Sequence, residues 1–322
     1  MNRLKITLLK SFVLILQGTL CQVLVANAQN DQNIFTSDVD HFWQAFDSMH
    51  TVQDKEQQIA FMKTLYTDKA TPGLLQFMEV RHFDAVKLVE NITKYPKFWA
   101  SIRPNTLRVK EKLPAIEQAI ADFRKLYPEL RNAKMYFTIT ATRSAGTVKD
   151  SISLIGTELA TGNKYTDVSE FPDNRLASFF KNQESDNILL VAVHEYVHTQ
   201  QKAEGKILLG QCLDEGACDF VAEQVLKTTL TNSYLVYGRS HEDTLKTQFK
   251  KEMMGTDFSN WLYNGAVSKT MGDLGYFMGY VICKSYYLHA KDKKKAIKDI
   301  ISLDYSDQAA ILKFLDDSKY YQ

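Results

Sequence analysis

The 322-residue sequence has few cysteines, almost no net charge and no long hydrophobic run. Its 4 cysteines are too few for a disulfide-rich scaffold. It contains no internal repeat, no low-complexity stretch and no apolar run long enough to span a membrane. Because 39 basic residues face 38 acidic ones, nothing indicates a nucleic acid or an anionic membrane as a partner. The 45% of hydrophobic residues can bury a sizeable core, in one large domain or two small ones.

Residues 1–28 have the layout of a secretory signal peptide. A basic start leads into an apolar stretch and the small-x-small cleavage motif Ala26-Asn27-Ala28. The apolar stretch is too short and too interrupted to span a membrane. Cys21 offers an alternative, the lipid anchor of a membrane-anchored lipoprotein, although Gly18-Thr19-Leu20 is a poor approach to a lipidated cysteine. We therefore predict an exported protein, secreted or periplasmic, with the lipoprotein as the alternative.

Three cysteines remain after cleavage, which is an odd number: Cys212, Cys218 and Cys283. Cys212 and Cys218 cannot pair if one helix carries both, because six residues rise about 9 Å along a helix. A Cys218–Cys283 disulfide remains open, and so do plain buried thiols.

Residues 29–130 are predicted to be helical, because apolar side chains recur three and four positions apart. The expected helical stretches are 39–50, 59–66, 74–81, 85–92 and 109–127. We expect a connector between Pro96 and Pro104, since proline disfavours a helix interior.

The periodicity changes at 135–142, where apolar and polar residues alternate as in a half-buried strand. A second strand is predicted at 151–157, as a hairpin or neighbouring pair with the first, and 143–150 is predicted to be a loop. From residue 173 onward the pattern is helical again. The expected helices are 174–181, 187–204, 212–230, 241–254, 272–290, 293–302 and 307–317.

The most specific motif lies in the helix expected at 187–204. His194 and His198 are four residues apart, so on a helix both imidazoles lie on one face and can bind one ion. Glu195 lies about 100° around the helix, where its carboxylate can reach a metal-bound water without being a ligand. In this H-E-x-x-H pattern two neutral histidines hold zinc and the glutamate is the general base. The alternative is a core helix with two hydrogen-bonded histidines.

Glu215 is the expected third ligand, with sixteen residues between it and His198. Two histidines, one glutamate and an open position form the catalytic zinc set. Asp219 is one helical turn further, where it can accept a hydrogen bond from a ligand histidine and fix its tautomer. Cys218 is an alternative ligand, but thiolate-rich zinc sites tend to be structural.

The motif at 194–198, followed by Glu215-Gly216-x-x-Asp219, resembles the gluzincin metallopeptidases. The match to the thermolysin type is the acidic residue four positions after the third ligand, and Asp214 to Cys218 resemble the corresponding segment of aminopeptidase N. The gap from His198 to Glu215 is a little shorter than in aminopeptidase N. No G-x-M-E-N-type motif precedes the zinc helix, so the resemblance does not imply aminopeptidase specificity.

Three segments resemble a group of secreted bacterial proteins described as zinc-dependent proteases, which is akin to gliding-motility lipoproteins of the Bacteroidetes. The segments are 153–158, 194–201 and 272–280, and the whole resemblance covers about residues 72–316. It implies a mostly α fold with a small β-sheet (α+β), made of an N-terminal helical region at 29–130 and a zincin-like metallopeptidase domain at 131–322. In gluzincins the edge strand of the sheet lines the cleft, whereas here the sheet could instead only pack against helices.

We therefore expect an exported peptidase that binds Zn²⁺ through His194, His198 and Glu215 and hydrolyses peptide or protein substrates. Glu195 would take the proton of the zinc-bound water as it attacks the carbonyl, and would then pass it to the leaving amine. The alternative is a non-catalytic metal-binding or partner-binding envelope protein that retains the peptidase fold. No residue pattern indicates the cleavage specificity.

A donor opposite the metal would stabilise the negative charge that develops on the attacked carbonyl oxygen. Gluzincins commonly place a tyrosine or histidine well after the third ligand. The candidates are His241, Tyr263, Tyr276 and Tyr280. Tyr276 and Tyr280 share a helix face and could both reach the cleft, and we favour Tyr276, with Tyr280 second. A role as core aromatics is the alternative.

Three glycines surround these tyrosines: Gly272, Gly275 and Gly279. Glycine costs about 1 kcal/mol in a helix interior, so it predicts the close approach of another backbone. The helix that carries His194 is the expected neighbour.

Overall fold

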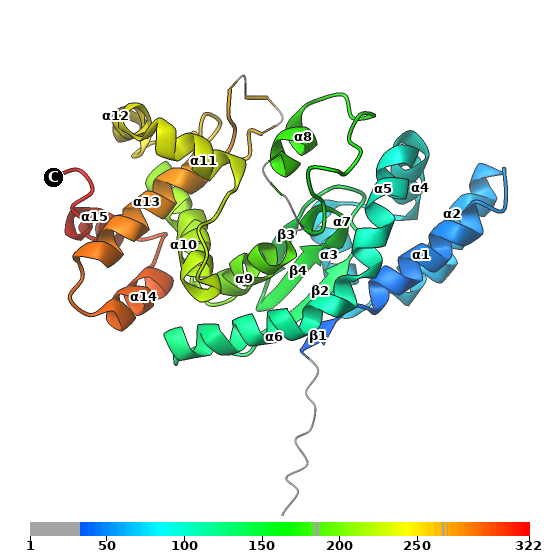
Figure 1. The fold of residues 1–322 in the computed structure, drawn as a ribbon, viewed down its shortest axis with the longest axis horizontal. Helices are drawn as coiled ribbons and strands as arrows, with labels where there is room; N and C mark the ends of the chain where they lie inside the picture. Colours follow the sequence, from blue (N-terminus) through cyan, green and yellow to red (C-terminus); the bar gives the residue numbers. More distant parts are fainter. Residues whose placement is uncertain (1–32, 182, 184–186, 266, 269) are drawn as a thin grey trace, which may run out of the picture. The chain divides into compact units, whose positions relative to one another are not determined.

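The computed structural model describes residues 33–322 apart from positions 182, 184–186, 266 and 269 (Figure 1). The predicted signal peptide and Cys21 lie outside the described residues. Residues 33–322 form one compact unit. Among these described residues, no helix is both long enough and apolar enough to cross a bilayer. The fold is mostly α with a small β-sheet, which confirms the predicted class.

The N-terminal helices and one short 3-10 helix (η1) are α1 (Ser37–Met49), α2 (Lys55–Leu65), η1 (Thr67–Lys69), α3 (Pro72–Arg81), α4 (Ala85–Lys94), α5 (Pro96–Leu107) and α6 (Val109–Leu126). Side chains of Asp54, Thr71 and Asp84 cap three of them by accepting from backbone N–H groups of the first turn. The connector expected between Pro96 and Pro104 is instead α5. This helix buries Phe98 and Trp99 completely, which offsets the hydrogen bond lost at Pro104.

Four strands form the sheet in the order β1-β2-β4-β3: β1 (Ile34–Phe35), β2 (Lys134–Thr138), β3 (Gly146–Lys149) and β4 (Ile152–Gly156). β1, β2 and β4 are parallel, and β3 is antiparallel to β4 at the edge. The two predicted strands are therefore parallel neighbours and do not form a hairpin. The loop expected at 143–150 was wrong, because it contains β3. The first strand ends at Thr138, since Ala141 and Thr142 adopt φ of 54° and 60°, outside the β region.

The sheet separates α3 from the predicted metal-binding helix, α9 (Ile188–His198). Tyr136 of β2 contacts Gly73 of α3, and Gly146 of β3 contacts the side chain of Glu195 of α9. Tyr136 aligns with Leu154, whereas Gly146 aligns with Ile155, so the two contacts lie on opposite faces. The edge strand β3 thus lies beside α9.

The other C-terminal helices are α7 (Thr157–Ala160), α8 (Arg175–Phe180), α10 (Leu208–Leu226), α11 (Ser233–Ser240), α12 (Glu242–Glu252), α13 (Leu274–His289), α14 (Lys293–Ser302) and α15 (Gln308–Asp317). Figure 1 shows α9, α10 and α13 as successive neighbours. α9 ends at His198, several residues before the predicted end, and α11 was not predicted.

α10 and α13 approach so closely that their backbones touch. A side chain at Gly279 of α13 would overlap the carbonyl of Cys212, and one at Gly216 of α10 would overlap the backbone of Tyr280. The glycines therefore do permit close backbone contact, as predicted. The expected neighbour was wrong, because Gly279 faces α10 and not the helix that carries His194.

Candidate metal centre

α9 positions two of the predicted ligands by burying its apolar residues. Ile188 and Leu190 to Val193, which precede the motif, are buried, so packing holds the helix in place at His194. Glu215 and Asp219 lie one turn apart on α10, which contacts α9. The predicted ligands are thus brought together by the packing of these two helices.

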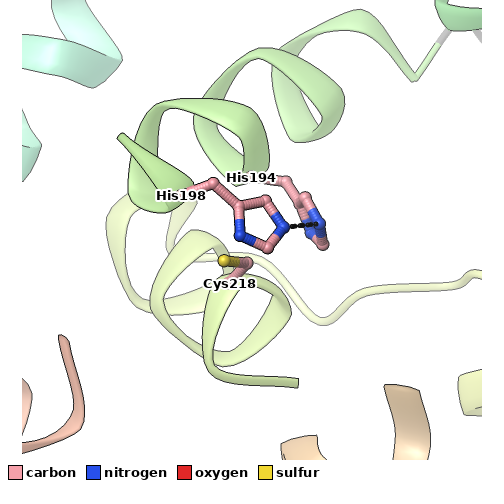
Figure 2. Close-up of side chains that lie close together, drawn as sticks. All are labelled: His194, His198 and Cys218. Atoms are coloured by element: carbon pink, nitrogen blue, oxygen red, sulfur yellow. Dashed lines mark hydrogen bonds between the residues drawn. The ribbon is translucent and has the colours of Figure 1, made fainter. Parts of the chain in front are cut away.

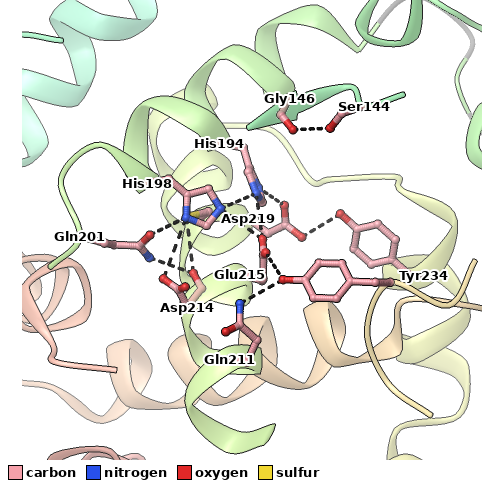
Figure 3. Close-up of polar contacts among 12 residues, drawn as sticks. Ser144, Gly146, His194, His198, Gln201, Gln211, Asp214, Glu215, Asp219 and Tyr234 are labelled. Carbon is pink, nitrogen blue, oxygen red and sulfur yellow. Dashed lines mark hydrogen bonds and ion pairs between the residues drawn. The ribbon is translucent and has the colours of Figure 1, made fainter. Parts of the chain in front are cut away.

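Three ligand atoms converge, as Figure 3 shows. His194 Nε2 and His198 Nε2 are 3.2 Å apart. Glu215 Oε2 lies 3.2 Å from His198 Nε2 and 3.4 Å from His194 Nε2. All three side chains are nearly buried, with 11–18% of their surface exposed.

The outer nitrogen of each histidine meets an acceptor. His194 Nδ1 lies 2.9 Å from Asp219 Oδ1, and Tyr234 donates to the other oxygen of that carboxylate at 2.9 Å. His198 Nδ1 lies 2.6 Å from Gln201 Oε1. An acceptor at Nδ1 selects the tautomer with the proton on Nδ1, which leaves the Nε2 lone pair free.

Glu215 has an outer partner of its own. Tyr263 donates its hydroxyl proton to Glu215 Oε1 at 2.9 Å, and Gln211 donates to the Tyr263 hydroxyl oxygen at 3.0 Å. Each of the three side chains that face the common point is therefore oriented by a separate hydrogen-bonding group.

This donor set fits zinc. Three acceptor lone pairs face one another with no hydrogen-bond donor between them, which only a cation or an added proton can stabilise. Tetrahedral zinc with bonds of 2.0–2.1 Å separates its ligand atoms by about 3.3 Å, which matches the distances here. Two histidines and one carboxylate leave the fourth position open.

Cys218 lies on the other side of the His198 ring from the place where the three ligand atoms converge. Its sulfur is 3.5 Å from Gln201 Oε1, the acceptor of His198 Nδ1, and Figure 2 shows it beside the imidazole. Ligand atoms of His194, His198 and Cys218 lie within 4.8 Å of one another, a looser group than the one with Glu215. Burial raises the pKa of the Cys218 thiol, which disfavours the thiolate that zinc requires. Cys212, Cys218 and Cys283 are all free and buried.

The electrostatics of the site favour a cation. Burial lowers the pKa of the His194 imidazole, but the carboxylates of Asp219 and Glu215 outweigh it and hold that pKa well above its ordinary value. Burial would raise the pKa of Glu215, yet His198 and His194 hold it well below the usual range. A field that favours a proton on the imidazoles also favours a metal ion among them.

Glu195 lies beside the three ligands and does not contact them through a hydrogen bond. Its side chain is 7% exposed, and burial raises its pKa against the opposing effect of His194 and His198. It lines a cleft of about 1200 Å³ together with all three ligand residues and β3. A carboxylate with a raised pKa, open to a cleft, is a suitable general base.

The four candidate oxyanion donors lie in different places. Tyr276 lines the cleft, its ring 6.2 Å from that of His194, and its hydroxyl has no hydrogen bond to any described residue. Tyr263 also lines the cleft but is bound to Glu215. Tyr280 is buried away from it and donates to Glu223 at 2.7 Å. His241 is exposed at the start of α12, stacked on Tyr237.

A family model for gliding motility protein GldB matches residues 26–254. This match spans well over half of the sequence. The chain belongs to the GldB family. No curated protein and no solved structure matches it. The family label also describes lipoproteins, which supports association with the cell envelope.

The GldB match includes α9 and α10, so the three candidate ligands and Asp219 lie within it, whereas Tyr263 and Tyr276 lie beyond its end. Sequence reasoning missed Gln201, Gln211 and Tyr234. Gln211 is four residues before Glu215 on one helix, a spacing that could have indicated it. Tyr234 lies on α11, and no pattern connects it to the site.

Proposed function

We propose that this GldB-family chain is an exported zinc-dependent peptidase. The observation that carries the proposal is the convergence of three lone pairs, from His194, His198 and Glu215, at 3.2–3.4 Å from one another. The buried carboxylate of Glu195 beside them, open to the cleft, distinguishes a hydrolytic site from a purely structural one.

Bound zinc would lower the pKa of a coordinated water towards 7 and polarise the substrate carbonyl. Glu195 would accept the proton of the attacking water and deliver it to the leaving amine. Tyr276 is the proposed donor to the carbonyl oxygen, because its hydroxyl reaches the cleft without another partner among the described residues. Asp219 holds His194 in the required tautomer.

The open edge of β3 supports an extended peptide as the substrate. Ala145 accepts a hydrogen bond from Gly156 of β4, so by the alternation of an antiparallel ladder the backbone groups of Gly146 and Val148 point away from the sheet. The Gly146 carbonyl already accepts from Ser144, whereas its N–H and both backbone groups of Val148 have no partner among the described residues and could pair with a substrate. Recognition would then depend mainly on the substrate backbone.

Membership of a lipoprotein family favours the envelope as the site of action. It also favours a lipid anchor at Cys21 over soluble secretion. Globomycin-sensitive processing and labelling with a radioactive fatty acid, in wild type and a Cys21→Ser variant, would decide between the two.

The central test compares wild type with Glu195→Gln, in zinc content and in digestion of a peptide library read by mass spectrometry. We expect about one zinc per chain in both proteins, and hydrolysis reduced by at least 100-fold in the variant. Lys202→Gln, a surface change at the cleft rim, is the matched control. Full activity in Glu195→Gln would refute the mechanism.

The second candidate is a metal-binding envelope component that does not catalyse, as the name of the gliding motility family favours. Such a protein would bind zinc and cleave no peptide in the library. A buried general base beside a metal is costly to keep without a catalytic use, which is why we place this candidate second.

A further inference from the structure

Tyr263 has an unusual backbone and an unusual side-chain environment for an aromatic residue. Its φ is 57°, in the left-handed region that few residues other than glycine adopt. Tyr263 has 65% of its surface exposed, although its hydroxyl contacts Glu215 in the candidate metal centre. The ring therefore contributes little to the core, and packing does not explain its position.

The residues on both sides hold Tyr263 in this conformation. Trp261 is buried, and its carbonyl accepts from the backbone N–H of Gly275 at 2.7 Å. Asn264 and Asp273 bond reciprocally, the backbone N–H of each to the side-chain oxygen of the other. Strained backbone that is fixed by its surroundings is typical of functional positions.

The hydrogen bonds determine the direction of the Tyr263 proton. A tyrosine hydroxyl has one proton to donate, and Gln211 already donates to its oxygen at 3.0 Å. The proton is therefore directed to Glu215 Oε1, at 2.9 Å. The other carboxylate oxygen, Oε2, is the one that faces His194 and His198.

We propose that Tyr263 is a positioning residue that keeps Glu215 a one-oxygen ligand. By binding Oε1, Tyr263 would withhold that atom from a bound metal ion and so leave room for water beside the three ligands. This inference rests on the proposed zinc site. It gives Tyr263 a different role from Tyr276, which makes no hydrogen bond to a proposed ligand and is the proposed donor to the substrate.

The test replaces zinc by Co²⁺, whose visible absorption weakens when a fifth ligand joins a four-coordinate site. In Tyr263→Phe, Oε1 is released to the metal, so we expect a weaker, five-coordinate spectrum and a 10- to 100-fold fall in peptide hydrolysis. Tyr165→Phe, an exposed tyrosine that does not line the cleft, should match wild type in both measurements.

Gln211→Met is the second variant, because it removes the bond that directs the tyrosine proton and should change the spectrum in the same direction by less. Thermal melting of the metal-free proteins checks that each variant folds. A four-coordinate Co²⁺ spectrum of wild-type intensity in Tyr263→Phe and Gln211→Met overturns the inference while leaving the peptidase intact. A wild type that takes up no metal overturns both the inference and the proposed function.

Discussion

Two tyrosines one helical turn apart on α13 have different environments, so we expect them to have different roles. Tyr276 lines the cleft, and its hydroxyl has no hydrogen-bond partner among the described residues, whereas Tyr280 donates to the nearly buried carboxylate of Glu223. We expect Tyr276→Phe to lower kcat at least tenfold with zinc content and melting temperature nearly unchanged. Tyr280→Phe should destabilise the fold by about 1–3 kcal/mol and leave kcat unchanged, because it removes a partner of a nearly buried carboxylate.

Steady-state kinetics and urea denaturation of the two variants check this contrast. If Tyr276→Phe kept full kcat, the donor would be another group, and the free hydroxyl in the cleft would have no catalytic meaning.

The choice between Glu215 and Cys218 as third ligand can be made with single substitutions. We expect His194→Ala and Glu215→Ala to lose the bound zinc, and Cys218→Ser to retain about one zinc per chain, because Cys218 lies on the Nδ1 side of His198. Metal analysis of the purified proteins after dialysis measures this directly. Zinc loss in Cys218→Ser with retention in Glu215→Ala would reverse the assignment.

The residues that could be predicted were those on regular helices. His194, Glu195 and His198 have a fixed angular relation on α9, and Asp219 follows Glu215 by one turn on α10, so spacing alone placed them. Two further partners, Tyr234 and Tyr263, come from α11 and from a loop. Tyr263 reaches Glu215 from a left-handed backbone conformation. Tertiary contacts impose this conformation, so the periodicity of the sequence does not indicate it.

At the scale of elements, the close contact between α10 and α13 can be tested by substitution. A methyl group at Gly279 would overlap the Cys212 carbonyl, and backbone cannot move as a side chain does. Although alanine favours a helix by about 1 kcal/mol, we expect Gly279→Ala to lose 1–3 kcal/mol or more of stability.

Gly255→Ala is the matched control, because a methyl group there meets only the Glu252 carbonyl at 3.2 Å. Its free energy of unfolding in urea should lie within about 0.5 kcal/mol of wild type. Equal stability of the two variants would show that the helices separate easily.

The sheet shows why elements were harder to predict than the motif. β3 has only four residues, all half-exposed, so it lacks the alternation that marks a strand. The parallel pairing of β2 with β4 was not predictable either, since a short separation in sequence favours a hairpin. Both depend on partners that only the folded chain supplies.

At the scale of the whole molecule, pH should affect stability through buried carboxyls. Burial raises the pKa of Glu158, although one oxygen accepts three hydrogen bonds from Thr140 and Thr142. An acid whose pKa rises on folding is most stabilising below its unfolded-state pKa, and this contribution is lost as pH rises through the folded-state value. The side chain in the Glu158→Gln variant cannot ionise, so this variant does not lose stability in this way as pH rises.

We therefore expect the stability of Glu158→Gln, relative to wild type, to increase between pH 4 and pH 7, by at most about 1.4 kcal/mol per pH unit. Urea denaturation of both proteins at each pH measures the difference. A constant difference would mean that Glu158 keeps its ordinary pKa in the folded chain.

The contact between Gly146 and Glu195 offers a way to sort the relatives of this chain. A side chain at position 146 would overlap the side chain of Glu195, the proposed general base. In a relative that keeps both histidines and the acidic ligand but carries a larger residue at the equivalent of Gly146, we expect Glu195 to be displaced from its proposed position while the proposed metal ligands remain. The residue at this one strand position should thus divide the lineage into hydrolases and metal-carrying scaffolds, and it can be read from sequence alone.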